Sequence, residues 1–399
     1  MKKDKKKGIM MEQGLNKQKT KAVYGVAVLM MIYHHLFCLP NRLDYNYTPI
    51  LYINGINIEQ ILAWFCKICV AMYAFITGYG LIKISNKYKK NNPIGRIVNC
   101  YKIIIKQAVK FFSKFWLVCL FFLPIGFTIL GNKFEIEEFI YNIIGINNSY
   151  NQEWWYIFQY LKMLLIFPII DFWLEEIFQK NNKKRKLIFI TIQIICCIFI
   201  EKNQKISTFA LVLYEFLGPY TLVFLVGNIF AKLDIFLKIK KAIDKRHFSR
   251  KLFAIILLQI VIYGRMKSTV SELDMKYDYI FVPFFILAIE LLVNEKGKIG
   301  KTLISFGKRS TYIWLLHTFF CYYYFKEYIL MAKYSILIYL VVTLLSYISA
   351  LIIDKVYRIL KYISLIKVKI YVKPIINISR LNQILQVAET VEGKIRIEK

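Results

Sequence analysis

The feature that most constrains this chain is a series of long apolar runs separated by short, lysine-rich segments. The chain has 399 residues, of which 57% are hydrophobic. Inside a bilayer only helices and closed barrels satisfy every backbone hydrogen bond, and about 20 apolar residues make one spanning helix. The sequence therefore predicts an all-α integral membrane protein rather than a protein built around one large water-soluble helical core.

Ten transmembrane helices are expected from the apolar runs, of which the fifth and the seventh are short. The runs cover residues 22–38, 59–82, 107–131, 154–175, 187–200, 207–231, 252–264, 279–294, 310–325 and 334–353. They divide the chain into a basic leader, 1–21, a ten-helix membrane domain, 22–353, and a basic tail, 354–399. No cleavage site for a signal peptide is evident after the first run, so we treat this run as the first membrane helix.

The basic residues alternate in density from one connecting segment to the next. Of the 56 lysines and arginines, 43 lie in the leader, the tail and every second connection, nine lie in the other connections, and four lie within spans. Basic connections stay on the cytoplasmic side of a membrane. The alternation predicts a multi-pass protein of the cell membrane with both termini in the cytoplasm, and the leader is expected to lie near anionic lipid.

Charge and cysteine usage exclude two other classes of function. The net charge is +31, but the basic residues lie between apolar runs, where they act as topology signals, and no nucleic-acid partner is expected. Cys66 and Cys69 form a CxxC inside an apolar run without a second pair. We interpret them as packing residues, and no metal site is predicted.

Ionisable residues inside the spans are the first candidates for function, because burying them in a bilayer is unfavourable. His34 and His35 lie in the outer half of the first span, and Lys67, Lys162 and Glu215 lie about 12 Å from an outer boundary. Together these residues predict a polar cavity in the outer half. The alternative for the two lysines is snorkelling to the interface, which we also expect for Lys110 and Lys114 near the inner boundary.

The two adjacent histidines point about 100° apart on a helix, so they face different surroundings. One interpretation is a buried, hydrogen-bonded pair. The other is a general base, since a neutral imidazole can take a proton from a hydroxyl near neutral pH.

A second polar feature, residues 87–96, combines Lys89, Lys90 and Arg96 with proline and glycine on the cytoplasmic side. This composition suits a site for an anionic cofactor phosphate. An ordinary basic connection explains it equally well.

Five stretches, in this order along the chain, resemble acyltransferase family 3, the membrane-bound enzymes that O-acylate cell-surface carbohydrates and other acceptors. They are Gly25 to Phe37 with its Tyr-His-His, Ala71 to Gly80 ending in Gly-Tyr-Gly, Arg96 to Tyr101, Trp154 to Pro168, and Ser310 to Phe319 with its Leu-His. The similarity covers nearly the whole chain. Its closest branch is the one that modifies polysaccharides of the cell envelope.

The resemblance implies an acyl-coenzyme A donor, acetyl-coenzyme A in the simplest case, and a glycan hydroxyl as the acceptor. It implies that His35 deprotonates this hydroxyl or relays its proton. The expected site residues are His35, His34 and Glu215 for catalysis; Arg96, Lys89, Lys90 and Lys21 for the donor phosphates; and His317, Lys67, Lys162 and Trp155 for the substrate pocket.

This chain departs from the family pattern at several positions. Tyr24 stands where the family has a basic residue eleven positions before the histidine, and Tyr160 stands where other branches have a glutamate. Lys21, one turn before Tyr24, is a candidate for the missing positive charge. Pro93 precedes Arg96 where the family often has a second arginine, and Asn99 replaces a proline.

Two other classes of function stay open at this point. Polar residues at mid-depth also suit a transporter or flippase for a lipid-linked glycan or a small anion. Tyr24 leaves room for a catalytically silent membrane subunit. Transfer or hydrolysis of acyl-coenzyme A by the purified protein discriminates among the three.

Overall fold

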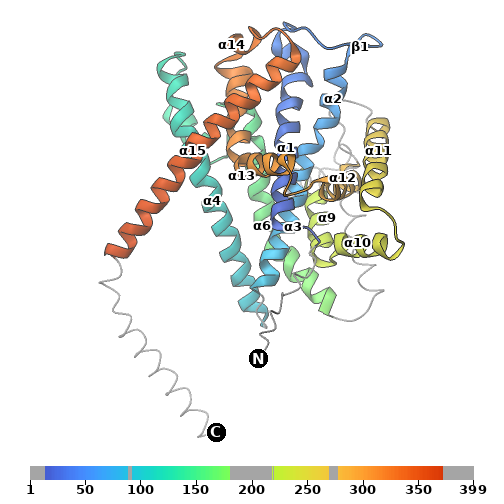
Figure 1. The fold of residues 1–399 in the computed structure, drawn as a ribbon. Coiled ribbons are helices and arrows are strands. Elements are labelled where there is room, and N and C mark those ends of the chain that lie inside the picture. Colours follow the sequence, from blue (N-terminus) through green and yellow to red (C-terminus); the bar gives the residue numbers. More distant parts are fainter. Residues whose placement is uncertain (1–13, 89–91, 180–217, 219, 269–276, 372–399) are drawn as a thin grey trace, which may run out of the picture. The chain divides into compact units, whose positions relative to one another are not determined.

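The computed structural model describes residues 14–88, 92–179, 218, 220–268 and 277–371, and this part of the chain is all-α apart from one short hairpin (Figure 1). The α-helices are α1 Lys17–Phe37, α2 Ile58–Cys66, α3 Ile68–Lys87, α4 Pro93–Thr128, α5 Ile136–Ile143, α6 Trp155–Gln179, α9 Thr221–Lys232, α10 Ile235–Lys245, α11 Arg250–Ser268, α12 Asp278–Leu292, α13 Lys298–Thr318, α14 Lys326–Leu330 and α15 Ser335–Tyr371. The short elements are the 3-10 turns η1 Pro40–Leu43 and η2 Gln152–Trp154, the π-helical turn η3 Phe319–Tyr323, and the strands β1 Tyr52–Ile53 and β2 Ile56–Asn57.

Four helical segments of the described chain are long and apolar enough to cross a bilayer: Ile58–Lys87, Ile94–Thr128, Gln152–Ile177 and Ser335–Ile363. Large apolar side chains point outward on three of them, with exposed fractions of 67% for Leu120, 65% for Leu165 and 58% for Leu344. Such exposure suits contact with lipid tails and is unfavourable in water. The predicted all-α membrane class is confirmed, whereas the fifth span and much of the sixth lie outside the described residues.

Two helices begin well before the apolar runs that predicted them. The side chain of Asn92 caps the first turn of α4 by accepting a hydrogen bond from the Gly95 amide at 2.6 Å, and Pro93 occupies the first helical position. The segments 83–106 and 295–309, expected as connections, are therefore largely helical. Apolar length identifies the buried part of a helix, but local capping decides where the helix starts.

Helices α1 and α13 pack backbone to backbone through two glycines. A Cβ atom on Gly25 would lie 2.0 Å from the Leu303 carbonyl oxygen, and a Cβ on Gly307 would lie 1.7 Å from the Lys21 carbonyl oxygen. Small residues permit this close approach between membrane helices, where dispersion contacts replace the hydrophobic effect. The contact fixes the polar residues of α1 relative to those of α13.

The second predicted span is broken at Lys67, between α2 and α3. Arg265 of α11 donates to the carbonyl oxygens of Trp64 and Phe65 at this break, each at 3.1 Å. Arg265 is itself held by Asp278 at 2.7 Å. A bilayer provides no water to satisfy such carbonyls, so this arginine makes the interruption possible within a membrane helix.

The chain divides into two compact units, residues 1–350 and 351–399, and the division falls inside α15. The second unit is described as far as residue 371 and continues this helix. Exposed isoleucines, among them Ile352 and Ile359, alternate on it with Lys355 and Arg358. All site residues discussed below belong to the first unit.

Candidate active site

A cavity of about 690 Å³ runs among helices α1, α3, α4, α6 and α13. From α1 it is lined by Lys21, Tyr24, Met31, His34 and His35, which share one face of the helix. Lys21 and His35 are fourteen residues apart, or about 21 Å along the axis. One continuous space therefore connects the start of the first membrane helix with its histidine pair.

The histidine at position 35 forms a dyad with His317 of α13. The Nδ1 atom of His35 lies 2.7 Å from Nε2 of His317. Nδ1 of His317 lies 2.8 Å from the Trp314 carbonyl oxygen and 3.0 Å from that of Ile313. His317 is fully buried, whereas His35 lines the cavity.

These partners fix the tautomer of each ring. Carbonyl oxygens only accept, so Nδ1 of His317 carries its proton and Nε2 of His317 accepts. His35 must then donate from Nδ1, which leaves its Nε2 with a lone pair and, among the described residues, no hydrogen-bond partner. A neutral imidazole of this kind, oriented by a second group, is the arrangement of a general base.

His34 faces a different environment, as the 100° rotation between neighbouring residues predicts. Its Nδ1 donates to the Ala63 carbonyl oxygen at 2.9 Å, on α2. Its ring also lines the cavity. Both rings are hydrogen-bonded, which fits the interpretation of a buried pair. Only His35 is hydrogen-bonded to a second histidine, which fits the interpretation of a general base.

The end of the cavity beyond the histidines is lined by Arg42, Glu153 and Tyr322. Arg42 pairs with Glu153 at 2.5 Å and lies over the Tyr322 ring, 5.1 Å from its centroid. The Tyr322 hydroxyl donates to the His35 carbonyl oxygen. These contacts hold the backbone of His35 in place, and the sequence analysis did not find them. The only signal was that Arg42 is the single basic residue between 39 and 58.

The cavity carries far more positive than negative charge. Of the described residues that line it, six are lysine or arginine and one, Glu153, is a carboxylate. The cations are Lys21, Arg42, Lys67, Lys110, Lys114 and Lys308. Glu153 lies at the histidine end, so the opposite part suits an anionic ligand.

Lys21 shows the effect of this charge imbalance. It lies just before the first predicted span, and burial together with the positive charges of Lys308 and Lys17 lowers its pKa. A ligand with negative charge would relieve this repulsion. We call the part of the cavity lined by Lys21 and Lys308 the lysine mouth.

Comparison with known families agrees with this geometry. A family model described as an acyltransferase domain matches residues 23–355, most of the chain. The chain belongs to acyltransferase family 3. No curated protein and no solved structure matches it. The family resemblance is thereby confirmed, and the chain is placed among membrane acyltransferases rather than transporters.

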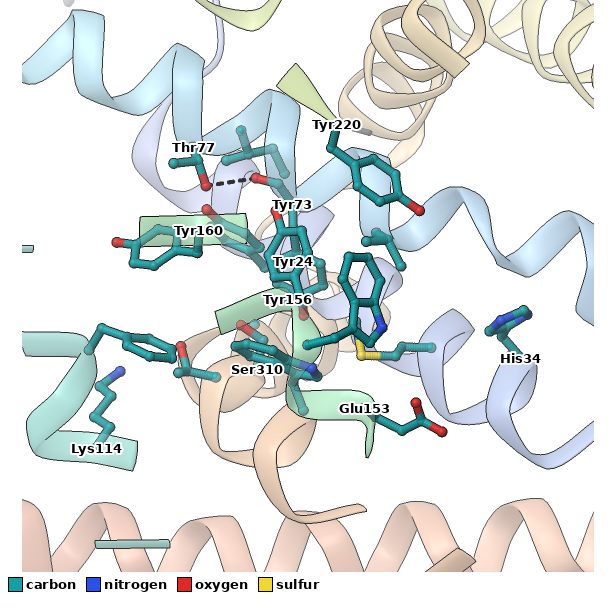
Figure 2. Close-up of a pocket in the computed structure, with 18 of the residues that line it drawn as sticks. Tyr24, His34, Tyr73, Thr77, Lys114, Glu153, Tyr156, Tyr160, Tyr220 and Ser310 are labelled. Carbon is teal, nitrogen blue, oxygen red and sulfur yellow. Dashed lines mark hydrogen bonds between the residues drawn. The ribbon is translucent and has the colours of Figure 1, made fainter. Parts of the chain in front are cut away.

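Two departures from the pattern of acyltransferase family 3 meet in the cavity. Tyr24, at the position of the family's basic residue, and Tyr160, at the position of a glutamate in other branches, both line it. Figure 2 shows Tyr24 and Tyr160 with Tyr73 and Tyr156 in the middle of the site, between Lys114 and His34. This acyltransferase therefore has tyrosines where the family pattern has a basic residue and where other branches have a glutamate.

Arg96 has a different set of partners from the phosphates predicted for it. It is 6% exposed, and its Nε and Nη1 atoms lie 2.7 Å from Asp171 and 2.6 Å from Glu175 of α6. Lys232 of α9 also pairs with Glu175. Arg96 does not line the cavity, and its charge is compensated within a cluster of two cations and two carboxylates that links α4, α6 and α9.

The other predicted site residues are divided between the cavity and elsewhere. Lys67 and Trp155 line it, while Lys162 instead lies over the Phe158 ring, 4.7 Å from the centroid. Lys89, Lys90 and Glu215 lie outside the described residues. Lys110 and Lys114, expected to snorkel, line the cavity, because α4 continues through this level as one long helix.

Within the described ranges, no three histidine, cysteine, aspartate or glutamate residues are grouped closely enough to hold a metal ion.

Proposed function

We propose that this acyltransferase is a ten-span cell-membrane O-acyltransferase, with both termini in the cytoplasm. It transfers an acyl group, in the simplest case acetyl, from acyl-coenzyme A to a hydroxyl of a surface or secreted glycan. The observation that carries the proposal is a continuous cavity that is lined both by the lysine mouth and by His35. The position of His35 in the first predicted span and the match to the acyltransferase family support it.

The charge alternation sets the direction of the cavity in this proposal. Lys21 and Lys308 belong to segments rich in basic residues, so the lysine mouth faces the cytoplasm. His35 and Arg42 then lie toward the outside. A cytoplasmic donor and an external acceptor reach the same base from opposite ends, and the acyl group needs no separate carrier across the bilayer.

The donor site is proposed at the lysine mouth and along the cationic wall formed by Lys110 and Lys114. Coenzyme A carries several phosphate charges, and lysine ammonium groups bind phosphate by charge-assisted hydrogen bonds. The distance of about 21 Å from Lys21 to His35 suits the extended arm that separates these phosphates from the thioester. Arg96 is not part of this site, because its carboxylate partners satisfy it.

In the proposed reaction, the tautomer of the dyad leaves the lone pair of His35 Nε2 available to accept a proton. Nε2 of His35 takes the proton of the acceptor hydroxyl as the oxygen attacks the thioester carbon. The carbon–sulfur bond breaks, the ester forms, and the proton passes to the departing thiolate, so His35 returns to its neutral state. His317 accepts from Nδ1 throughout and stabilises the imidazolium, since a hydrogen bond from a charged donor is stronger than a neutral one.

The test is acetyl transfer by the purified full chain. We expect acetyl-coenzyme A to release free thiol in the presence of a glycan acceptor, and the host's surface polysaccharide to lose its acetyl esters when the protein is removed. Mass spectrometry of the polysaccharide reads this directly. An unchanged polysaccharide together with no thiol release would refute the proposal.

Orientation has an independent test by cysteine labelling on intact cells. A cysteine introduced at Ser149, in the connection 132–153, should react with a membrane-impermeant reagent. One introduced at Lys298, in the segment 295–309, should stay unlabelled until the cells are opened. The reverse pattern would invert the proposed direction of the cavity.

A further inference from the structure

Two tyrosine hydroxyls in the cavity lack a well-formed hydrogen bond among the described residues. The hydroxyl oxygens of Tyr73 and Tyr156 are both buried, and both residues line the cavity; Ser310 lies near the Tyr73 hydroxyl without completing a bond of ordinary geometry. Tyr156 is 7% exposed. A buried hydroxyl without a partner is unfavourable by about 1–3 kcal/mol, so such groups in a native site call for a ligand or water.

The two tyrosines approach the middle of the cavity from different helices, Tyr73 from α3 and Tyr156 from α6. The Tyr73 ring lies 5.3 Å from that of Tyr24 on α1. The Tyr156 ring lies 5.6 Å from that of Trp314 on α13. The two hydroxyls therefore belong to the part of the cavity between the lysine mouth and the dyad.

The surroundings of these hydroxyls are aromatic and uncharged. Tyr156 contacts the rings of Tyr220 and Trp314, and Tyr160 contacts that of Phe111. Figure 2 shows Tyr24, Tyr73, Tyr156 and Tyr160 gathered in the middle of the site. A ligand segment that fits there is uncharged, slender and equipped with hydrogen-bonding groups.

We propose that Tyr73 and Tyr156 form a subsite for the amide-bearing pantetheine arm of the donor, their hydroxyls donating to its two amide carbonyls. This inference rests on the proposed function, because it names the part of the donor that passes between the lysine mouth and His35. The arm is uncharged and carries two amides at separate points along its chain. The subsite therefore aligns the thioester with the dyad while the lysines hold the phosphates.

The subsite makes a prediction about the protein without ligand. Because the Tyr156 hydroxyl has no partner among the described residues and the Tyr73 hydroxyl only an electrostatic contact with Ser310, Tyr73→Phe and Tyr156→Phe remove no well-formed hydrogen bond from the empty protein. Their melting temperatures should be equal to that of the wild type or higher. A structural role for either hydroxyl would lower the melting temperature, and this measurement also verifies that the variants fold.

The deciding experiment measures binding of three probes to the full chain in detergent: coenzyme A, 4′-phosphopantetheine, and 3′,5′-ADP, which lacks the arm. We expect each phenylalanine variant to bind coenzyme A and 4′-phosphopantetheine about 3- to 10-fold more weakly than the wild type. Binding of 3′,5′-ADP should not change. Tyr150→Phe is the matched control, since its hydroxyl is also buried without a partner but lies outside the cavity lining.

The possible failures separate the two proposals. If the wild type binds coenzyme A and both variants bind it equally well, the arm subsite is wrong and the proposed function stands. If the variants lose affinity for 3′,5′-ADP to the same extent, the tyrosines do not act on the arm, and the inference is again overturned. If the wild type binds none of the three probes, the donor site of the proposed function fails, and the subsite fails with it.

Discussion

Two regions of this acyltransferase gather positive charge, and they differ in how much negative charge accompanies it. In the cluster of Arg96, Lys232, Asp171 and Glu175, two cations face two carboxylates at ion-pair distance. In the cavity, the described lining residues include six cations and one carboxylate, Glu153. Balanced charge in a low-dielectric setting holds helices together, whereas an excess of one sign prepares a site for a ligand of the other sign.

The sharpest way to test the cavity side of this comparison is to remove its base. His35→Ala should lower the rate of acyl transfer by about 10²- to 10⁴-fold, because no other described ring nitrogen has the same relay behind it. His34→Ala removes the same side chain at the same depth and should cost much less activity. Steady-state thiol release measures both, and the opposite ranking would mean that the base is His34.

The balanced cluster should respond in stability rather than in donor affinity. Arg96→Ala leaves Asp171 buried without its main partner, and losing one member of a buried pair is destabilising by about 3–5 kcal/mol. We expect a clear fall in melting temperature, with the donor KM of the surviving enzyme nearly unchanged. Arg96→Lys keeps the charge but loses the forked geometry, so its melting temperature should lie between those of Arg96→Ala and the wild type. A large rise in donor KM without loss of stability would return Arg96 to the role first predicted from the sequence.

Substitutions in the lysine mouth should change donor affinity rather than stability. Lys308→Ala removes one charge-assisted phosphate contact and should raise the donor KM about 10- to 100-fold, with little effect on stability. Lys298→Ala, on the exposed first turn of the same helix, is the control and should leave the KM unchanged. Equal effects of the two substitutions would reduce the lysine mouth to general electrostatic attraction.

Substitution of His317 should change kcat by a factor similar to, or smaller than, the change in donor KM expected for Lys308→Ala. His317→Leu removes the acceptor that fixes the His35 tautomer and should lower kcat about 10- to 100-fold, the value of a hydrogen bond to a charged group. His317→Gln offers an oxygen acceptor and should restore part of the rate. Equal losses in both variants would indicate that His317 acts through packing alone.

The smallest expected effect is a pH dependence of donor binding. Burial and the neighbouring charges of Lys308 and Lys17 lower the Lys21 pKa from 10.5. Lys21 is therefore charged at low pH and loses its proton earlier than an ordinary lysine as the pH rises, and donor KM should increase in that range. Lys21→Arg keeps its charge and should flatten the rise. A profile that is identical in both proteins would exclude Lys21 from phosphate binding.

The sequence alone supplied the membrane class and the position of most described helices. These follow from local information, namely apolar length. The catalytic role of His35 came from the family resemblance, and it stays a prediction. The partners of Arg96 and His35 are not local, because Asp171 is 75 residues from Arg96 and His317 is 282 residues from His35. The sequence of a basic segment does not show whether its arginine binds a phosphate or pairs with a carboxylate.

Lys110 and Lys114 show a second reason why prediction stopped short. Snorkelling was inferred from their distance to a span boundary, but α4 starts at Pro93 and continues to Thr128 without a break. This length places both lysines on the cavity wall. The departures at Tyr24 and Tyr160 were visible in the sequence, yet only the fold shows that they line one space.

The measurement that tests the central claim most directly is a cryo-EM structure of the full chain with bound coenzyme A. The account predicts phosphates against Lys21 and Lys308, and the sulfur within reach of Nε2 of His35. The cluster of Arg96, Asp171 and Glu175 should be unchanged by the ligand. Coenzyme A bound at Arg96, or on the surface outside the cavity, would contradict the distinction between the balanced ion-pair cluster and the predominantly cationic cavity on which the account depends.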